Sequence, residues 1–511
     1  MTNKHFVIIT AILIALASQR AELSFAQPGG RPGGGPGARN AQKIEYKGAT
    51  SYNADVETRD QTYASENAEE LALLVTSGVA KVTNSTIVKS GDPSGRNDSY
   101  DFYGVNAAAL ATEGGTLEIN GGSITTDSSY SSGLFAYGTG IIKAREVEIE
   151  TNSHNSGGVM VTGGGTLDGV NLTIVTEGGS SAAIRSDRGG GKLMIDGGSY
   201  TTNGSGSPAI YSTADITVKN ASLTSTQSEG AIIEGRNSIT LENTKLVDDN
   251  TTLHGKSTTR KNIFIYQSFS GDAKIGASNF SAKDCEIVTK RGDSVYVTNT
   301  SCVVTLTGNK IVNEDSSGYF LRAQREGWGR KGANGGAVVM TLANQDVEGN
   351  IFIDNISTLT LAITQGSHYV GALNSANTAK ELAVTLDAES TLELTADAYV
   401  SSFENADPTG QNVKLNGHKL HIGEEFVPDN LPETGDDKGF GPGAPPDGGR
   451  PADGEFGPPA PPQDDRVQFG SPRRPNEVRA GMGGGRARGA RPARPGEGRG
   501  SRGERPRRPE R

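Results

Sequence analysis

An eight-residue pattern that recurs along the chain constrains its fold more than any other feature of the sequence. In each copy, positions 1, 3 and 8 are apolar and position 6 is mostly small, as in the copy from Leu117 to Ile124. Steps of two residues within each half indicate a strand with one buried face. The step of three between the halves inserts one residue, so the chain turns a corner without flipping that face. Small or polar residues such as Gly121 and Asn220 lie at the corner, where left-handed dihedrals must be tolerated.

Copies of the pattern return at a nearly constant interval. Clear copies start at Ala80, Leu117, Ile142, Leu167, Leu193, Ile216, Ile239, Phe280 and Val304, and weaker ones at Met340 and Val413. Those from Leu117 to Ile239 start 25, 25, 26, 23 and 23 residues apart. A period in this range is typical of a solenoid. The wider intervals elsewhere predict inserted loops.

Each period also holds a second short strand, as at Leu134–Tyr137 and Val159–Thr162. Coils of about three strands stack like residues above like and form parallel sheets around a narrow core. Such a core explains how 34% hydrophobic residues suffice in a chain with 70 Gly among 511 residues. The same composition excludes a tightly packed helical protein and a disulfide-rich scaffold. We expect an all-β parallel β-helix of about 10–13 coils with disordered termini.

This pattern resembles the right-handed parallel β-helix superfamily that includes the pectate lyases, over about residues 66–423. It is most similar to uncharacterised secreted bacterial β-helix proteins that are described as carbohydrate-binding or adhesin-like. The resemblance implies a right-handed coil. It does not imply one activity, because unrelated functions share this fold.

The start of the chain predicts export. A basic start, an apolar run of 12 residues over 6–17 and small residues at Ser24 and Ala26 indicate a signal peptide over 1–26. The run is shorter than the ~20 residues that span a bilayer, so we expect no transmembrane segment in the mature chain. Residues 27–65 are expected to hold a Gly/Pro-rich linker and the start of an N-terminal cap. The protein is then secreted or attached to the cell surface.

The end of the chain predicts a disordered tail in two charge blocks over 424–511. Residues 424–465 hold eleven acidic and two basic residues, and 466–511 hold fourteen Arg and four Glu. Both blocks are rich in Pro and Gly and too poor in apolar residues to bury a core. The acidic body before them disfavours a nucleic-acid partner. Residues 431–435 read Leu-Pro-Glu-Thr-Gly, like a cell-wall sorting motif, but no apolar span follows, so its role stays open.

Aromatic side chains concentrate on one side of the second strands. Alternation places the second and fourth residues of each strand outside the coil. These positions hold Phe135, Tyr137, Tyr211, Phe264, Tyr266, Tyr296 and Phe320, together with Arg185, Asp187 and Arg322. An exposed ladder of rings with scattered charges suits stacking on sugar rings. Two alternatives stay open, because loops or the chain's own termini could cover this face, or a protein partner could dock there. Trp328, in an inserted loop, could add to the face.

One polar stretch suggests a catalytic alternative. Asp187, Glu234 and the neighbouring Arg188 and Arg236 could form an acid/base and anion-binding set. Glu234 is assigned to a core-facing position, where a carboxylate must be paired or its pKa must rise. The resemblance implies that such an enzyme would be a polysaccharide lyase, with Ca²⁺ as a possible cofactor, or a hydrolase. A bonded carboxylate in a turn is the structural alternative.

Other candidate sites are weaker. The six His share no metal-ligand spacing, so we expect no metal site. Cys285 and Cys302 occupy different columns of the repeat, which favours two separate small residues, although a disulfide after export is possible. We therefore expect an exported protein that binds polysaccharide or another envelope component through the aromatic face. The alternatives are a lyase or hydrolase that acts on an acidic glycan, and a structural, adhesin-like surface protein.

Overall fold

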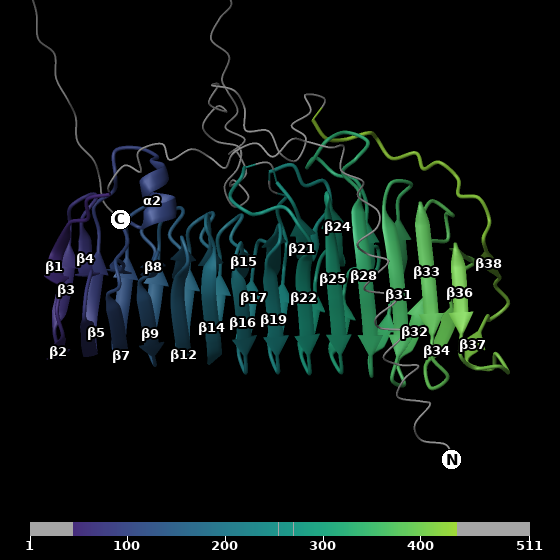
Figure 1. Cartoon of the computed structure of the whole chain (residues 1–511), viewed down its shortest axis with the longest axis horizontal. Helices are drawn as coiled ribbons and strands as arrows, with labels where there is room; N and C mark the ends of the chain where they lie inside the picture. The colour runs from purple at the N-terminus through teal and green to yellow at the C-terminus, as the bar shows by residue number, and fades with distance from the viewer. Residues whose placement is uncertain (1–43, 254, 269, 437–511) are drawn as a thin grey trace, which may run out of the picture. The chain divides into compact units, whose positions relative to one another are not determined.

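A computed structural model describes residues 44–253, 255–268 and 270–436. This part of the chain is nearly all β and winds into a parallel β-solenoid of about 15 turns (Figure 1). The expected fold class is therefore confirmed. There are a few more coils than the repeat predicts, because the first and last coils lack clear copies of the pattern. The signal peptide, residues 27–43 and residues 437–511 of the expected tail lie outside the described residues, whereas residues 424–436 of that tail are described and in part bonded to the rest of the chain.

One face of the solenoid is a parallel sheet of 12 strands. In order, its strands are β1 (Gly48–Tyr52), β4 (Leu71–Val75), β6 (Ala109–Ala111), β8 (Leu134–Tyr137), β11 (Val159–Thr162), β13 (Ile184–Ser186), β15 (Ile210–Ser212), β18 (Ala231–Glu234), β21 (Lys261–Tyr266), β24 (Asp293–Thr298), β27 (Leu321–Ala323) and β30 (Ile351–Ile353). These are the second strands of the repeat.

The other faces belong to a sheet of 20 strands that carries the eight-residue pattern. Its strands are β2 (Val56–Arg59), β3 (Thr62–Ser65), β5 (Val79–Lys89), β7 (Thr116–Thr126), β9 (Ile141–Arg145), β10 (Glu148–Thr151), β12 (Gly165–Thr176), β14 (Gly191–Thr202), β16 (Asp215–Lys219), β17 (Ser222–Ser225), β19 (Ser238–Glu242), β20 (Lys245–Asp248), β22 (Ser278–Lys283), β23 (Glu286–Thr289), β25 (Thr300–Thr307), β26 (Lys310–Asn313), β28 (Gly336–Ala343), β31 (Thr358–Thr364), β33 (Glu381–Leu386) and β36 (Ser402–Asn405). The last coils add β29 (Asp346–Glu348), β32 (His368–Gly371), β34 (Thr391–Leu394) and β37 (Val413–Lys414) in a sheet of four strands, and β35 (Ala398–Val400) with β38 (Leu420–Ile422) in a pair.

The corner of the pattern folds as its spacing predicts. Asn171, Asn220 and Asn243 stand at corners of the coils with φ values of 52°, 53° and 46°, and Gly197, with a φ of 77°, stands at the corner between the first two. Asn tolerates this left-handed region because its short polar side chain can bond locally. The Nδ2 of Asn243 donates to the Oδ1 of Asn220 at 2.8 Å, so the corner residues of adjacent coils are also linked.

The core is a single column of apolar side chains inside the coils. Residues at positions 1, 3 and 8 of the pattern, such as Leu117, Ile119 and Ile124, are buried there. Cys285 and Cys302 are both buried and free, which confirms the interpretation of two separate small residues.

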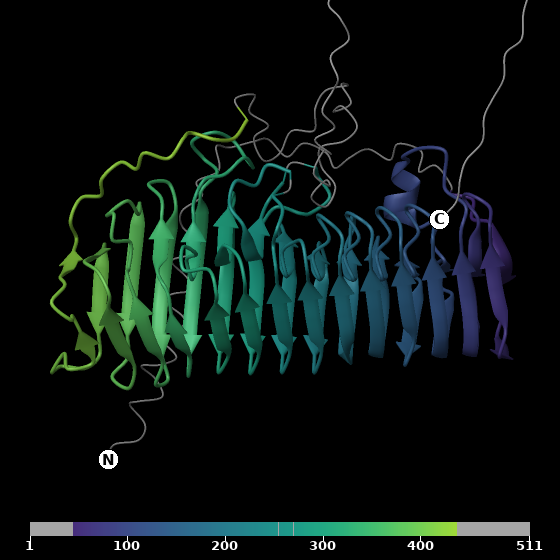
Figure 2. The ribbon, with the colours of Figure 1, turned by 180° about the vertical axis from the view of Figure 1, so that it is seen from behind.

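Long connections leave the coils on the side of the 12-stranded sheet. One of them carries α2 (Asp98–Tyr103), and others join β20 to β21, β21 to β22 and β27 to β28. Figures 1 and 2 show these connections along one edge of the stacked coils, and the chain that follows β38 returns above them.

Candidate functional site

Side chains on the outer face of the 12-stranded sheet line up from coil to coil. The parallel register joins Arg185 to Tyr211, Tyr211 to Ile232, Ile232 to Phe264, Phe264 to Tyr296 and Tyr296 to Arg322. Five of these six residues were expected to point away from the coil. Most of the rings form clusters separate from the main core, so the predicted direction of those side chains is confirmed.

The predicted exposure of this face is wrong. Phe135, Tyr211, Phe264, Tyr266, Tyr296 and Phe320 are at most 2% exposed, and Arg185 and Asp187 are buried as well. Tyr137 and Arg322 are half-buried. The chain covers the rings with its own inserted segments, which is one of the alternatives that the sequence left open.

Two positions were assigned to the wrong side of the coil. The register pairs Ile233 with Ser212 and Glu234 with Tyr266, so Glu234 points outward and not into the core. A shift of one residue in the assumed register reverses the direction of every side chain in a strand. Phe320 packs with the main core although Leu321 keeps the expected register with Val295, since Phe320 precedes β27 and does not follow the alternation of that strand.

The segment around α2 covers the N-terminal part of this face. Asn97 caps the helix and Gly104, with a φ of 69°, ends it. A side chain at Gly104 would collide with the ring of Phe135. The hydroxyl of Thr162 donates to the carbonyl of Phe102 at 2.6 Å, and the guanidinium of Arg188 lies 3.8 Å from the Phe102 ring centre.

A charged cluster lies beneath α2. The guanidinium of Arg185 pairs with Asp187 at 3.1 Å, and the Asn155 amide links Arg185 to Asp101. Arg188 pairs at 2.7 Å with Asp272, which comes from the loop between β21 and β22. Burial raises the pKa of Asp187 to about 7, although Arg185 favours its ionised form.

Glu234 is the centre of a second polar cluster. Its Oε2 accepts hydrogen bonds from the hydroxyls of Tyr211 at 2.6 Å and Tyr266 at 3.1 Å, and its Oε1 accepts from Ser268. Burial raises the pKa of Glu234, and these hydroxyl donors offset part of that effect. The carboxylate is therefore bonded within the chain, as the structural alternative predicted, but Glu234 ends strand β18 and does not lie in a turn.

A buried ion pair lies farther along the same face. Lys261 and Glu326 pair at 2.7 Å with no exposed side-chain area. The Lys261 ammonium also lies 4.0 Å from the ring centre of Tyr296 and 4.2 Å from that of Phe264. Such contacts stabilise a cation where water is excluded. Trp328 closes the cluster, with its ring centre 4.8 Å from that of Tyr266.

Arg322 lies at the end of the ladder and is also paired. Its guanidinium contacts the buried carboxylate of Asp293 at 2.5 Å and lies over the ring of Tyr319 at 4.3 Å. Burial raises the pKa of Asp293, and Arg322 offsets part of that effect.

The suggested catalytic set is only partly brought together. Asp272 interacts electrostatically with both Asp187 and Glu234, and Arg188 joins it, so these four groups share one region. Arg236 lies outside that region and is exposed, with its side chain against Gly276. Because all three carboxylates are buried and bonded, the arrangement is a structural network and not an acid/base pair open to a substrate.

The residues that sequence reasoning missed lie on the inserted segments. Asp101, Asp272 and Glu326 supply partners for the predicted side chains, yet none belongs to the repeat. Position in a repeat was the only signal that placed residues on this face. The repeat therefore could not predict which side chains of the inserted segments would pack against the rings.

Comparisons with known proteins do not assign a family. No protein-family model matches the sequence, and no curated protein and no solved structure matches the chain. Among residues 44–253, 255–268 and 270–436, no group of three or more His, Cys, Asp or Glu side chains is placed to hold a metal ion. Within the same ranges, no helix is long and apolar enough to cross a membrane.

Proposed function

We propose that this chain is an exported surface protein whose β-solenoid serves as a structural, adhesin-like scaffold. The observation that supports this proposal is the covering of the aromatic face by the chain's own segments. Rings that bind sugars must be open to the ligand on at least one face. Here the rings and the charges between them are packed as a second core, which stabilises the solenoid.

In this proposal, the uncovered faces of the 20-stranded sheet make the contacts with an extended polymer or with the cell envelope. Thr217, Thr240, Ser281, Thr305 and Thr341 follow one another in register on its outer side and are half-buried. Short hydroxyl side chains give this face a flat surface, which suits contact with an extended polymer or with the envelope.

The test measures two quantities for each variant, the free energy of unfolding and the retention of the protein on insoluble glycans. We expect Tyr296→Ala to lower the free energy of unfolding by about 3 kcal/mol, because it leaves a cavity in a packed cluster. Retention on insoluble glycans should not change while the variant is folded. Met194→Ala on the uncovered face is the control, and its effect should stay within about 0.5 kcal/mol. Retention that falls with Tyr296→Ala alone would overturn the scaffold proposal, as would release of reducing ends or unsaturated uronates with or without Ca²⁺.

Polysaccharide binding at the same face is a second candidate. It is favoured by buried polar atoms that have no hydrogen-bond partner among the described residues, namely Trp328 Nε1, Gln267 Oε1 and Gln324 Oε1. Sugar hydroxyls can both donate and accept, so a sugar ring among these side chains could bond atoms that the closed protein leaves unsatisfied. Such binding requires that the covering segment move.

A further inference from the structure

The chain beyond the last coil folds back onto an inserted loop. Residues 429–436, called the strap below, lie against residues 324–335, called the lid loop. Arg325 of the lid loop donates to the carbonyls of Leu431 at 2.9 Å and Pro432 at 3.3 Å. The same guanidinium pairs with the carboxylate of Asp429 at 3.1 Å. Asp354, at 3.1 Å, holds it from the side of the coils.

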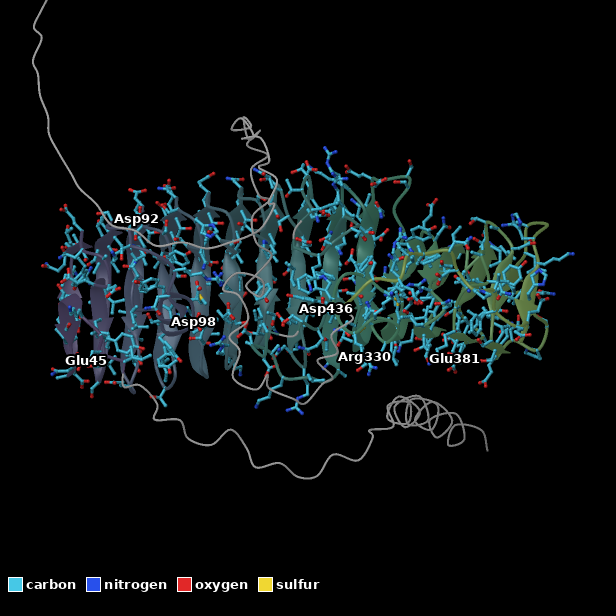
Figure 3. All side chains as sticks on the ribbon, turned by 90° about the horizontal axis from the view of Figure 1, so that it is seen from above. Glu45, Asp92, Asp98, Arg330, Glu381 and Asp436 are labelled. Atoms are coloured by element: carbon cyan, nitrogen blue, oxygen red, sulfur yellow. The ribbon has the colours of Figure 1, made fainter. Side chains whose placement is uncertain are left out.

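The far end of the strap is bonded as well. The hydroxyl of Thr434 donates to the carbonyl of Glu326 at 2.8 Å, and the amide of Asn334 donates to the carbonyl of Thr434 at 3.1 Å. Arg330 and Asp436, both labelled in Figure 3, lie beside each other and form a parallel bridge. The Leu-Pro-Glu-Thr-Gly stretch is therefore a docked, extended peptide.

Charge complementarity matches the strap to its binding surface. Its three acidic residues each meet a base of the loops: Asp429 meets Arg325, Glu433 meets Lys331 at 3.2 Å, and Asp436 meets Lys256 at 3.3 Å. The pairs of Glu433 and Asp436 are partly exposed and contribute little each, whereas the side chains of Arg325 and Asp429 are buried. The pair at the first residue of the strap therefore holds it most strongly.

The lid loop carries the side chains that close the aromatic cluster. Trp328 packs on Tyr266, and Glu326 pairs with Lys261 between the rings. Gly327 and Gly329 flank Trp328, and Gly329 has a φ of +88°, which only glycine adopts readily. Displacement of the lid loop would therefore remove the cover from the rings.

The closed lid leaves some of its own polar atoms unsatisfied. Trp328 Nε1, Gln324 Oε1 and Asn334 Oδ1 are buried and have no hydrogen-bond partner within the described part of the chain. Each such atom destabilises the closed arrangement, because it has given up its hydrogen bonds to water. The closed arrangement therefore depends on contacts made elsewhere, and those of the strap are the nearest.

We infer that residues 429–436 are a charge-held strap that locks the lid loop over an aromatic site for a sugar ring. The assignment of a sugar as the ligand rests on the second candidate function, whereas the holding of the lid loop by the strap does not. In the docked state the peptide bond between Thr434 and Gly435 is held against Asn334 and Gly329. Leu431–Gly435 then acts as a docking peptide.

The single Trp of the chain makes the lock measurable, because Trp328 lies in the lid loop. In the full mature chain, Asp429→Asn should raise acrylamide quenching of Trp328 severalfold and shift its emission to the red. Arg325→Ala should act in the same direction, and high salt should do so to a smaller extent, because it screens mainly the two partly exposed pairs. Arg291→Ala is the control, because it removes an exposed pair with Asp249 that does not touch the strap.

The outcomes are distinct. Quenching that equals the wild type in both Asp429→Asn and Arg325→Ala, with the far-UV circular dichroism of the sheets retained, would overturn the strap. A second measurement adds soluble oligosaccharides of neutral and uronic sugars to Asp429→Asn and to the wild type. At least tenfold tighter binding by the variant supports the site. Opening without binding overturns the sugar as ligand and, with it, the second candidate function, while it upholds the strap.

Discussion

At the scale of single residues, burial decides which polar side chains the solenoid tolerates. Inner positions at one corner of the coil hold Thr176, Thr202 and Ser225, and the hydroxyls of Thr176 and Thr202 each donate at 2.6 Å to a carbonyl five residues on. Asp248 takes the same position one coil after Ser225. Its Oδ1 has no hydrogen-bond partner among residues 44–253, 255–268 and 270–436, and burial raises the pKa of its carboxyl well above the ordinary range.

Asp248→Asn should therefore stabilise the protein at neutral and alkaline pH. A carboxyl whose pKa is raised in the folded state contributes stability below its unfolded pKa and loses it as the pH rises through the folded value. We expect a gain of about 1–3 kcal/mol at pH 8 and almost none at pH 4, from denaturant unfolding at both values. An equal gain at the two pH values would contradict this account.

At the scale of elements, each coil depends on small residues where strands of adjacent coils meet. Gly122 in β7 has a φ of +94°, and a Cβ there would lie 2.0 Å from the carbonyl oxygen of Ser85. A glycine is required at residue 122 because this corner brings two backbones together. Sequence spacing predicted the corner, and the close approach of the two backbones explains why a glycine stands there.

Gly122→Ala should cost more than an alanine at a glycine that has only the unusual dihedral. Gly114 supplies that comparison, since its φ is +91° and no atom lies within 4 Å of a Cβ built there. We expect Gly114→Ala to cost about 1 kcal/mol and Gly122→Ala about 1–3 kcal/mol more, because only the second must also displace backbone. Chemical denaturation of both variants measures the difference. Equal costs would mean that the dihedral alone matters.

At the scale of the whole molecule, the buried carboxyls set how stability depends on pH. The pKa values of Asp187, Glu234 and Asp248 are raised by burial, that of Asp187 to about 7. Hydrogen bonds lower the pKa values of the half-buried Glu286 and Asp407 at the surface. The first group destabilises the folded state as it ionises, and the second stabilises it only while ionised.

We therefore expect the free energy of unfolding to peak at mildly acidic pH. It should fall from about pH 5 to pH 8 as the buried carboxyls lose their protons, and fall again below about pH 4 as the bonded surface carboxylates gain them. Urea unfolding at intervals from pH 3 to pH 9 measures both sides of the curve. A steady rise from pH 5 to pH 9 would contradict the assignment of the buried groups.

The amino-acid sequence by itself determined the coil. The spacing of Leu117, Ile119 and Ile124 fixed which side chains are buried, and the corner residues fixed where the chain turns, because these are local constraints that each period repeats. Alternation within a strand also identified the aromatic face, except where the register was assumed one residue out, as at Glu234.

Only the tertiary structure decided what covers that face. Trp328 and Glu326 reach the rings from a lid loop that follows no repeat, and the strap holds that loop where Arg325 meets Asp429 from 104 residues away in the chain. Nothing local to either residue specifies such a contact, because it depends on where a long loop and the returning chain end meet in space. Whether the rings form an open surface or a packed second core depends only on where the long loop and the returning chain end meet.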